Sequence, residues 1–125
     1  TPMIGYVTLG VNDMTRAKAF YGDLLAEKGA KVVMDQGRLA FVSAGRGQPM
    51  LAICEPYDKN DPVPGNGTMV ALTADSKEQV DQLHQKALDL GATCDGPPGQ
   101  RIPDRFYGAY VRDPDGNKLC FFVFG

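Results

Sequence analysis

The feature that most constrains the fold of this chain is an internal repeat. Asp13 and Asp75 each lie where a helix is expected to begin, and Gly29 and Gly91 each lie where that helix is expected to end. Both pairs are separated by 62 positions, and an alanine follows each glycine. Equal spacing at the start and at the end of two helices indicates two copies of one structural unit.

The first copy predicts a strand, a helix and three further strands. Residues 3–11 are typical of a strand, and Asn12 or Asp13 is expected to cap the helix that follows. The apolar residues of this helix recur at helical spacing: Ala17, Phe20, Tyr21, Leu24 and Leu25. Tight turns then separate three short apolar segments, which are predicted to be strands at 31–35, 38–44 and 49–55.

The second copy predicts the same order of elements. A strand at 68–74 precedes a helix that Asp75 or Ser76 is expected to cap, and the apolar residues of this helix are Val80, Leu83, Ala87, Leu88 and Leu90. Strands are expected at 92–95, 106–113 and 118–124, with a long loop, GPPGQRIPD, at 96–104. His84, the only histidine, is expected at the flank of the packed face of this helix.

The repeat predicts an α+β fold of two βαβββ modules in a single domain, 1–125. Module 1 spans about 1–57, a connector rich in proline and glycine spans about 58–67, and module 2 spans about 68–125. One helix cannot cover both faces of a four-stranded sheet. The modules are therefore expected either to cover each other or to form a curved mixed sheet, with a concave cleft and the helices outside.

Composition excludes several classes of partner. The formal charge of −2 and the isoelectric point of about 5.2 argue against binding to nucleic acid. No stretch approaches the roughly 20 consecutive apolar residues of a membrane span, and the first residues do not resemble a signal peptide. Three cysteines without a CxxC pair fit a reducing compartment, so a cytoplasmic location is expected.

Three segments resemble the vicinal oxygen chelate superfamily. They are VTLGVNDMTRAKAFY at 7–21, the opening of the second module from GNGTMVALTADS onward, and its closing segment YVRDPDGNKL. This superfamily contains glyoxalase I, extradiol dioxygenases and the fosfomycin- and bleomycin-resistance proteins. The resemblance implies paired βαβββ modules, a ligand cleft and a homodimer. In the enzymes it also implies a divalent metal bound by histidine and by glutamate or glutamine.

The positions at which the resemblance places metal ligands are altered in this chain. Tyr6 and Met69 occupy the positions expected for histidines, and Cys120 occupies that of a glutamate. The remaining position falls within LAIC, with Glu55 just beyond it. A neutral phenol and a thioether are poor ligands for hard divalent ions. We therefore predict that the protein has no metal cofactor, with Glu55 and Cys120 as the only weak candidates for metal ligands.

The candidate ligand-binding residues are Tyr6, Met69, Arg101, Tyr107, Tyr110 and Cys120. The loop at 96–104 carries Arg101 toward the two tyrosines, and arginine with tyrosine can hold a carboxylate, phosphate or phenolate. The alternative is that Arg101 is a solvated loop residue. Cys120 is expected to be a small buried residue that lines the cleft rather than a reactive thiol.

Three functions are consistent with the sequence. The first is a binding protein that sequesters a polar or anionic aromatic compound in the cleft without a metal. The second is an enzyme of the superfamily, a glyoxalase-like lyase or a dioxygenase-like oxidoreductase, with an unusual metal set drawn from Cys120, Glu55 and Tyr6 or with Tyr6 as an acid. The third is a dimeric interaction module without a ligand. The sequence does not decide whether the protein is an enzyme.

Overall fold

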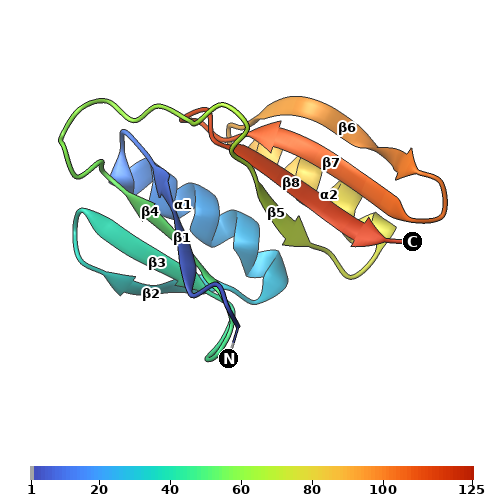
Figure 1. Cartoon of the computed structure of the whole chain (residues 1–125), viewed down its shortest axis with the longest axis horizontal. Coiled ribbons are helices and arrows are strands. Elements are labelled where there is room, and N and C mark those ends of the chain that lie inside the picture. The colour runs from blue at the N-terminus through green and yellow to red at the C-terminus, as the bar shows by residue number, and fades with distance from the viewer. Residues whose placement is uncertain (1) are drawn as a thin grey trace. The chain divides into compact units, whose positions relative to one another are not determined.

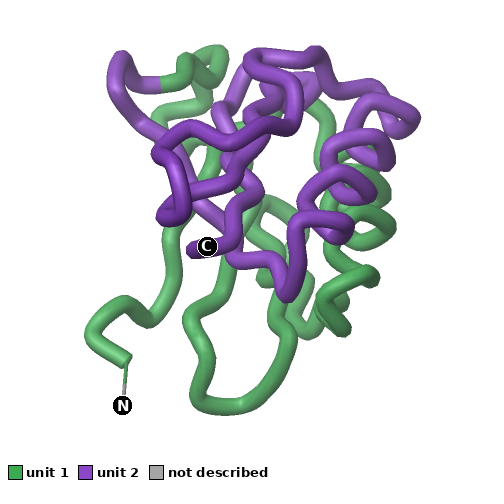
Figure 2. The backbone as a smooth tube through the Cα atoms, turned by 90° about the vertical axis from the view of Figure 1, so that its right-hand side faces the viewer, with its two compact units in different colours: residues 1–64 green, residues 65–125 purple. Residues whose placement is uncertain are grey.

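The structure is a computed structural model in which residues 2–125 are described. The chain divides into two compact units, residues 1–64 (unit 1) and residues 65–125 (unit 2), coloured separately in Figure 2. The boundary falls inside the expected connector. Each unit holds one four-stranded mixed sheet and one long helix (Figure 1), so the predicted α+β fold of two βαβββ modules is confirmed.

Unit 1 contains the elements of the first copy in the predicted order. They are β1 (Tyr6–Gly10), α1 (Met14–Leu25), the short 3-10 helix η1 (Ala26–Lys28), β2 (Lys31–Asp35), β3 (Leu39–Ser43) and β4 (Met50–Cys54). The strand order is β1-β4-β3-β2, in which β1 runs parallel to β4 and the other neighbours are antiparallel. Helix α1 packs against β2, β3 and β4.

Unit 2 repeats this arrangement. Its elements are β5 (Val70–Thr73), α2 (Lys77–Asp89), β6 (Thr93–Ile102), β7 (Phe106–Arg112) and β8 (Lys118–Phe124). The strand order is β5-β8-β7-β6, with β5 parallel to β8. Helix α2 packs against β6, β7 and β8.

Side-chain caps fix where the two long helices begin. Asp13 accepts a hydrogen bond from the backbone N–H of Arg16 at 3.1 Å, and Ser76 accepts one from that of Gln79, also at 3.1 Å. The side chain of Gln79 returns a bond by accepting from the backbone N–H of Asp75. These bonds satisfy N–H groups that have no partner inside the helix.

The segment 96–104 differs from the prediction of a loop. Strand β6 continues through it to Ile102, and only a short turn separates it from β7. Pairing is interrupted by three register shifts, between Cys94 and Gly96, between Gly96 and Gly99, and between Gln100 and Ile102. Because β6 is the edge strand, Pro97 and Pro98 lie where a missing N–H is tolerated. The prolines therefore produce an irregular edge strand rather than a loop.

No helix within residues 2–125 is long and apolar enough to cross a membrane.

Candidate functional site

The two faces of the sheet in unit 2 differ in what covers them. Cross-strand partners share a face, and successive residues of a strand alternate between faces. Ala109 with Phe121 and Val111 with Leu119 form fully buried pairs, and Tyr107 donates a hydrogen bond to Asp81 of α2 at 2.7 Å. These residues define the helix face. The opposite face, here called the open face, carries the alternate pairs of β7 and β8: Phe106 with Phe124, Gly108 with Phe122, Tyr110 with Cys120, and Arg112 with Lys118.

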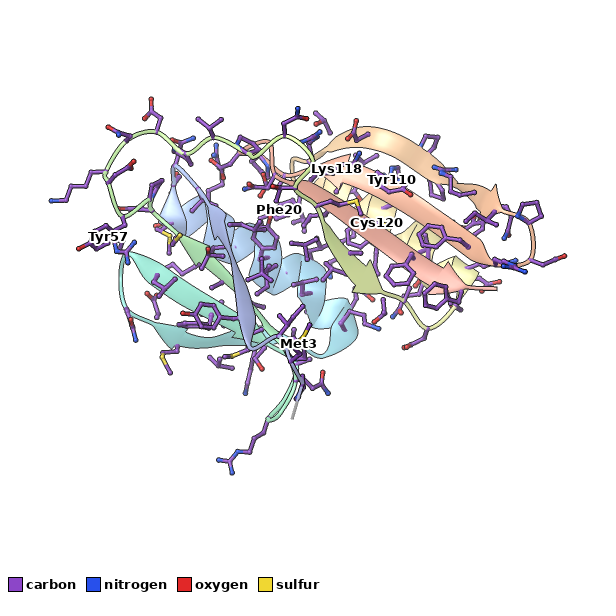
Figure 3. The ribbon with its side chains drawn as sticks, viewed as in Figure 1. Met3, Phe20, Tyr57, Tyr110, Lys118 and Cys120 are labelled. Carbon is purple, nitrogen blue, oxygen red and sulfur yellow. The ribbon has the colours of Figure 1, made fainter. Side chains whose placement is uncertain are left out.

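Tyr110 is the centre of the open face. The guanidinium carbon of Arg101 lies 5.5 Å from the centroid of its ring, and the ammonium nitrogen of Lys118 lies 5.2 Å from it. Both are within the range of cation–π attraction. Figure 3 shows Tyr110, Lys118 and Cys120 close together on β7 and β8. The open face therefore presents an aromatic ring with two cations beside it.

Cys120 pairs directly with Tyr110 across β8 and β7, and its side chain is fully buried. Burial raises the pKa of the Cys120 thiol, while a hydrogen bond with Tyr110 and the charges of Lys118 and Arg101 act in the opposite direction. A thiol whose pKa is raised remains protonated at neutral pH and is a poor nucleophile. Cys120 thus provides buried volume beside the tyrosine rather than reactivity.

Three glycines make room for the side chains of the open face. A Cβ on Gly96 would lie 2.8 Å from the ring of Tyr110, and one on Gly99 would lie 2.7 Å from the guanidinium of Arg101. A Cβ on Gly108 would lie 2.7 Å from the ring of Phe106. Any larger residue at these positions would displace a ring or the cation, so the glycines allow these groups to lie flat against the sheet.

An aromatic cluster continues the open face along β7 and β8. The rings of Phe106 and Phe122 are stacked with centroids 5.3 Å apart, and Phe124 makes edge contacts with both. Phe124 is 76% exposed. A cluster with an exposed ring can accept an aromatic ligand by stacking.

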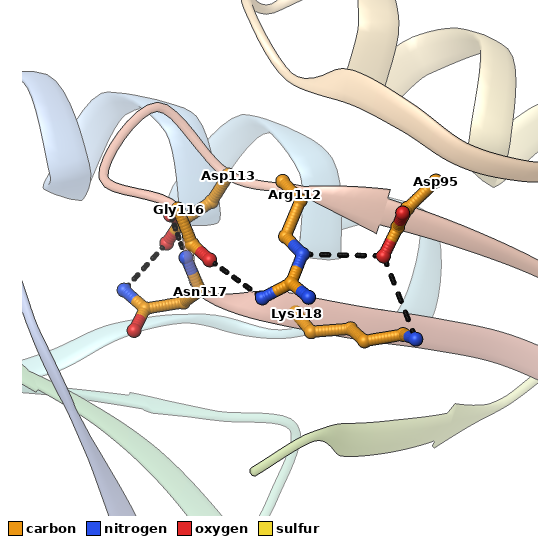
Figure 4. A network of polar contacts seen from close by, with 6 residues as sticks. All are labelled: Asp95, Arg112, Asp113, Gly116, Asn117 and Lys118. Carbon is orange, nitrogen blue, oxygen red and sulfur yellow. Dashed lines mark hydrogen bonds and ion pairs between the residues drawn. The ribbon is translucent and has the colours of Figure 1, made fainter. Parts of the chain in front are cut away.

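A polar network closes the other end of the open face (Figure 4). Asp95 binds Arg112 at 3.1 Å and Lys118 at 3.5 Å, and Arg112 also donates to the backbone carbonyl of Gly116. Within this network the two cations, Arg112 and Lys118, are balanced by two carboxylates, Asp95 and Asp113. Arg101, which lies over Tyr110 outside this network, is the cation of the open face that can attract an anionic ligand.

Of the predicted site residues, the structure brings Arg101, Tyr110 and Cys120 together. Tyr107 lies on the helix face, where Lys77 lies 5.6 Å from its ring, and the bond to Asp81 raises the pKa of its phenol. Met69 is 43% exposed and precedes β5, whose Ala71 pairs with Cys120. Tyr107 and Tyr110 therefore do not share a face.

Tyr6 and Glu55 belong to unit 1. Tyr6 is 52% exposed and contacts Phe41 edge to face with ring centroids 5.0 Å apart. Glu55 lines a surface pocket of about 440 Å³ at the ends of β1 and β4, whose other charged residues are Arg38, Lys59 and Asp61. Arg38 donates to the backbone carbonyl of Glu55 at 2.8 Å.

The residues at the implied metal positions do not fit a divalent ion. Tyr6 supplies a phenol, Met69 a thioether, and Cys120 a buried thiol whose pKa is raised. Within residues 2–125, no three His, Cys, Asp or Glu side chains are grouped so that they could hold a metal ion.

The fold consists of two βαβββ modules. The positions implied for metal ligands carry Tyr6, Met69 and Cys120 instead of histidine and glutamate. The model of the glyoxalase/bleomycin resistance protein/dioxygenase superfamily matches residues 3–121. The chain belongs to that superfamily.

Solved structures agree with this assignment. A glyoxalase/bleomycin resistance protein from Albidiferax ferrireducens T118 is 36% identical, with a TM-score of 0.86 and coverage of 97% of this chain and 98% of that one. Lactoylglutathione lyase from Agrobacterium tumefaciens is 29% identical, with a TM-score of 0.69 and coverage of 98% and 93%. A hypothetical protein, SA1046 from S. aureus, is 24% identical, with a TM-score of 0.76 and coverage of 98% and 94%, and shows the fold alone. No curated protein matches the chain.

The sequence analysis did not predict that Lys118 and the phenylalanine cluster share one face of the sheet with Arg101. The signal was present in KLCFFVF, because Lys118, Cys120, Phe122 and Phe124 alternate at the period of a strand. It also missed a contact on the helix face between His84 and Cys94, whose atoms lie 3.3 Å apart.

Proposed function

We propose that this protein binds a polar or anionic aromatic compound on the open face of unit 2 and acts by sequestering it. The observation that carries this proposal is the pair of cations, Arg101 and Lys118, beside the half-buried ring of Tyr110. The compound's anionic group would bind the cations, and its ring would stack on Tyr110 or on the phenylalanine cluster.

Arg101 is the proposed charged anchor. Its guanidinium donates to the carbonyl of Pro97, which holds the side chain over the sheet, and a planar guanidinium has five N–H donors. Donors therefore remain for a carboxylate or phosphate. Met69 and Cys120 are proposed to line the same surface. Tyr6, in unit 1, stays a predicted ligand-binding residue.

A lyase is the second candidate, because the A. tumefaciens protein, 29% identical, bears the name lactoylglutathione lyase. Two observations favour binding over this activity. The implied metal positions carry Tyr6, Met69 and Cys120, and the thiol of Cys120 is held protonated by burial. We also propose that the protein is cytoplasmic and forms a homodimer. Light scattering of the purified protein tests the dimer. A dimer that binds no ligand would favour the third function, an interaction module.

The test compares aromatic acids with neutral isosteres, such as benzoate-type acids and their amides, by calorimetry and thermal shift. Arg101→Ala should weaken binding of the acids by roughly 1.5 to 3 kcal/mol, the magnitude of a hydrogen bond to a charged group. Binding of the amides should change little. Arg101→Gln separates loss of charge from loss of the whole side chain.

Arg105→Ala is the matched control. Like Arg101, Arg105 is an exposed arginine; it lies in the turn between β6 and β7, and the hydrogen bonds described for it use only its backbone. It should bind the acids as the native chain does. Equal losses for acids and amides, or equal losses in the Arg101 and Arg105 variants, would contradict the anchor. Turnover of lactoylglutathione would favour the lyase instead.

A further inference from the structure

The helix face of unit 2 carries a second group of chemically competent side chains. Nε2 of His84 lies 3.3 Å from Sγ of Cys94, within the range of a hydrogen bond that involves sulfur. His84 belongs to the buried side of α2, with Val80, Leu83 and Ala87, and is only 7% exposed. Cys94 is an exposed residue of the edge strand β6.

The fold holds the two side chains together. Cys94 pairs with Val111, which is fully buried on the helix face, so the thiol points toward α2. Because β6 is the edge strand, no further strand covers the thiol from outside. The sulfur therefore contacts a buried imidazole on one side and is accessible to a reagent on the other.

The protonation state of His84 suits a proton acceptor. Burial lowers the pKa of its imidazole, and the negative charge of Asp81 opposes that shift. The imidazole is neutral at pH 7 and can receive a proton. Two other elements contribute titratable groups: Cys94 from β6, and Tyr107 from β7, which donates its hydroxyl to Asp81. The carboxylate of Asp81 favours the imidazolium that forms when a proton arrives.

The other two cysteines lack these properties. Burial raises the pKa of both the Cys54 thiol and the Cys120 thiol, and Cys120 is fully buried. Cys94 is therefore the one thiol of the three that is exposed and contacts a base.

We propose that Cys94 and His84 form a covalent modification site for soft carbon electrophiles, namely Michael acceptors such as unsaturated carbonyl compounds. As Sγ attacks the electrophile's β-carbon, the S–C bond forms and the thiol proton passes to Nε2 of His84. The electron pair of the carbon–carbon double bond moves to the α-carbon. The imidazolium then returns its proton to that carbon, so no other reactant is consumed. Asp81 is a positioning residue that acts through its charge on His84.

The experiment measures the rate at which N-ethylmaleimide labels each cysteine, resolved by peptide mass. At pH 7, Cys94 should react faster than Cys54 and Cys120. His84→Gln keeps a polar group at this position but cannot accept a proton. It should slow the labelling of Cys94 by at least about tenfold. This is a conservative value, because general acid–base catalysis contributes about a hundredfold or more in enzymes. Rates at the other cysteines should not change. Gln85→Ala, on the adjacent position of the same helix, is the matched control.

The pH profile of the native chain gives a second measurement, which does not depend on how any variant folds. Because the pKa of His84 is lowered, the labelling rate of Cys94 should rise through an inflection below pH 6.5, the ordinary value for histidine. Without assistance from His84, the labelling rate should show no inflection in that range. Equal rates in the native and His84→Gln chains, or a profile without an inflection below pH 6.5, would overturn the proposal. The result is independent of aromatic-acid binding, because Arg101 and Tyr110 lie on the opposite face.

Discussion

Asp113 is expected to be the most sensitive side chain of the turn between β7 and β8. It is 4% exposed and accepts hydrogen bonds from the backbone N–H groups of Asp115 at 2.9 Å and Asn117 at 2.8 Å. It also accepts from the side-chain amide of Asn117 at 3.0 Å. The turn determines the register that pairs Tyr110 with Cys120. Loss of this carboxylate should therefore affect both stability and the open face.

The magnitude follows from these bonds. Each hydrogen bond to a charged group contributes about 1.5 to 3 kcal/mol, but the three share one acceptor and are not additive, so Asp113→Ala should cost about 3 to 4 kcal/mol. For a chain of this length, that lowers the melting temperature by about 10 to 15 °C. Asp113→Asn keeps an oxygen for the two backbone donors but loses the bond from the amide of Asn117, and it should cost about 1 to 2 kcal/mol.

Urea unfolding followed by circular dichroism measures these differences as shifts in midpoint at constant slope. Asp89→Ala is the control. Asp89 is exposed on α2 and accepts one bond from Gln85, so its loss should change stability by less than about 0.5 kcal/mol. If Asp113→Ala costs less than about 1 kcal/mol, or no more than Asp89→Ala, the reasoning from the buried carboxylate is refuted.

Two further predictions concern metals and Cys120. Protein purified without added metal should contain substoichiometric Zn, Mn, Ni and Fe, and adding these ions should not raise its melting temperature. An ion that binds the native state would add about 2.7 kcal/mol to the free energy of unfolding at a hundredfold excess over Kd. A one-to-one metal content with a large thermal shift would therefore contradict the prediction. Cys120→Ala should lower stability by about 1 kcal/mol and change aromatic-acid affinity by no more than a fewfold, because its thiol is buried and protonated; rapid labelling of Cys120 in the folded chain would count against this.

The sequence predicts most of the fold because its signals are local. The strands at 31–35 and 118–124 have the expected bounds, and Asp13 caps α1 as expected. In the second copy Ser76, not Asp75, is the cap, so the repeat of 62 positions shifts by one residue at this point. Both side chains are good caps, and only the backbone conformation decides between them.

The surface around Tyr110 could be predicted only in part, since it depends on pairings that are distant in sequence. The role of Gly108 is visible only once Phe106 is seen to fold across it. The contact of His84 with Cys94 depends on how α2 packs against an edge strand ten residues further along the chain. Periodicity assigned His84 to the flank of the helix, but it cannot say what the side chain contacts.

The chemistry of unit 2 is divided between two faces by a bulge in β6. Cys94 pairs with Val111 on the helix face, whereas Gly96, two residues later, pairs with Tyr110 on the open face. In regular pairing, two residues separated by one position would share a face. The register shift between Cys94 and Gly96 breaks that rule, because two steps along β6 match one step along β7. The bulge therefore leaves the Cys94 thiol beside His84 while Asp95 reaches Arg112 and Lys118 on the open face. Without the bulge, Cys94 and Gly96 would lie on the same face of the sheet. Either the Cys94 thiol would then no longer contact His84, or Gly96 would no longer lie against Tyr110.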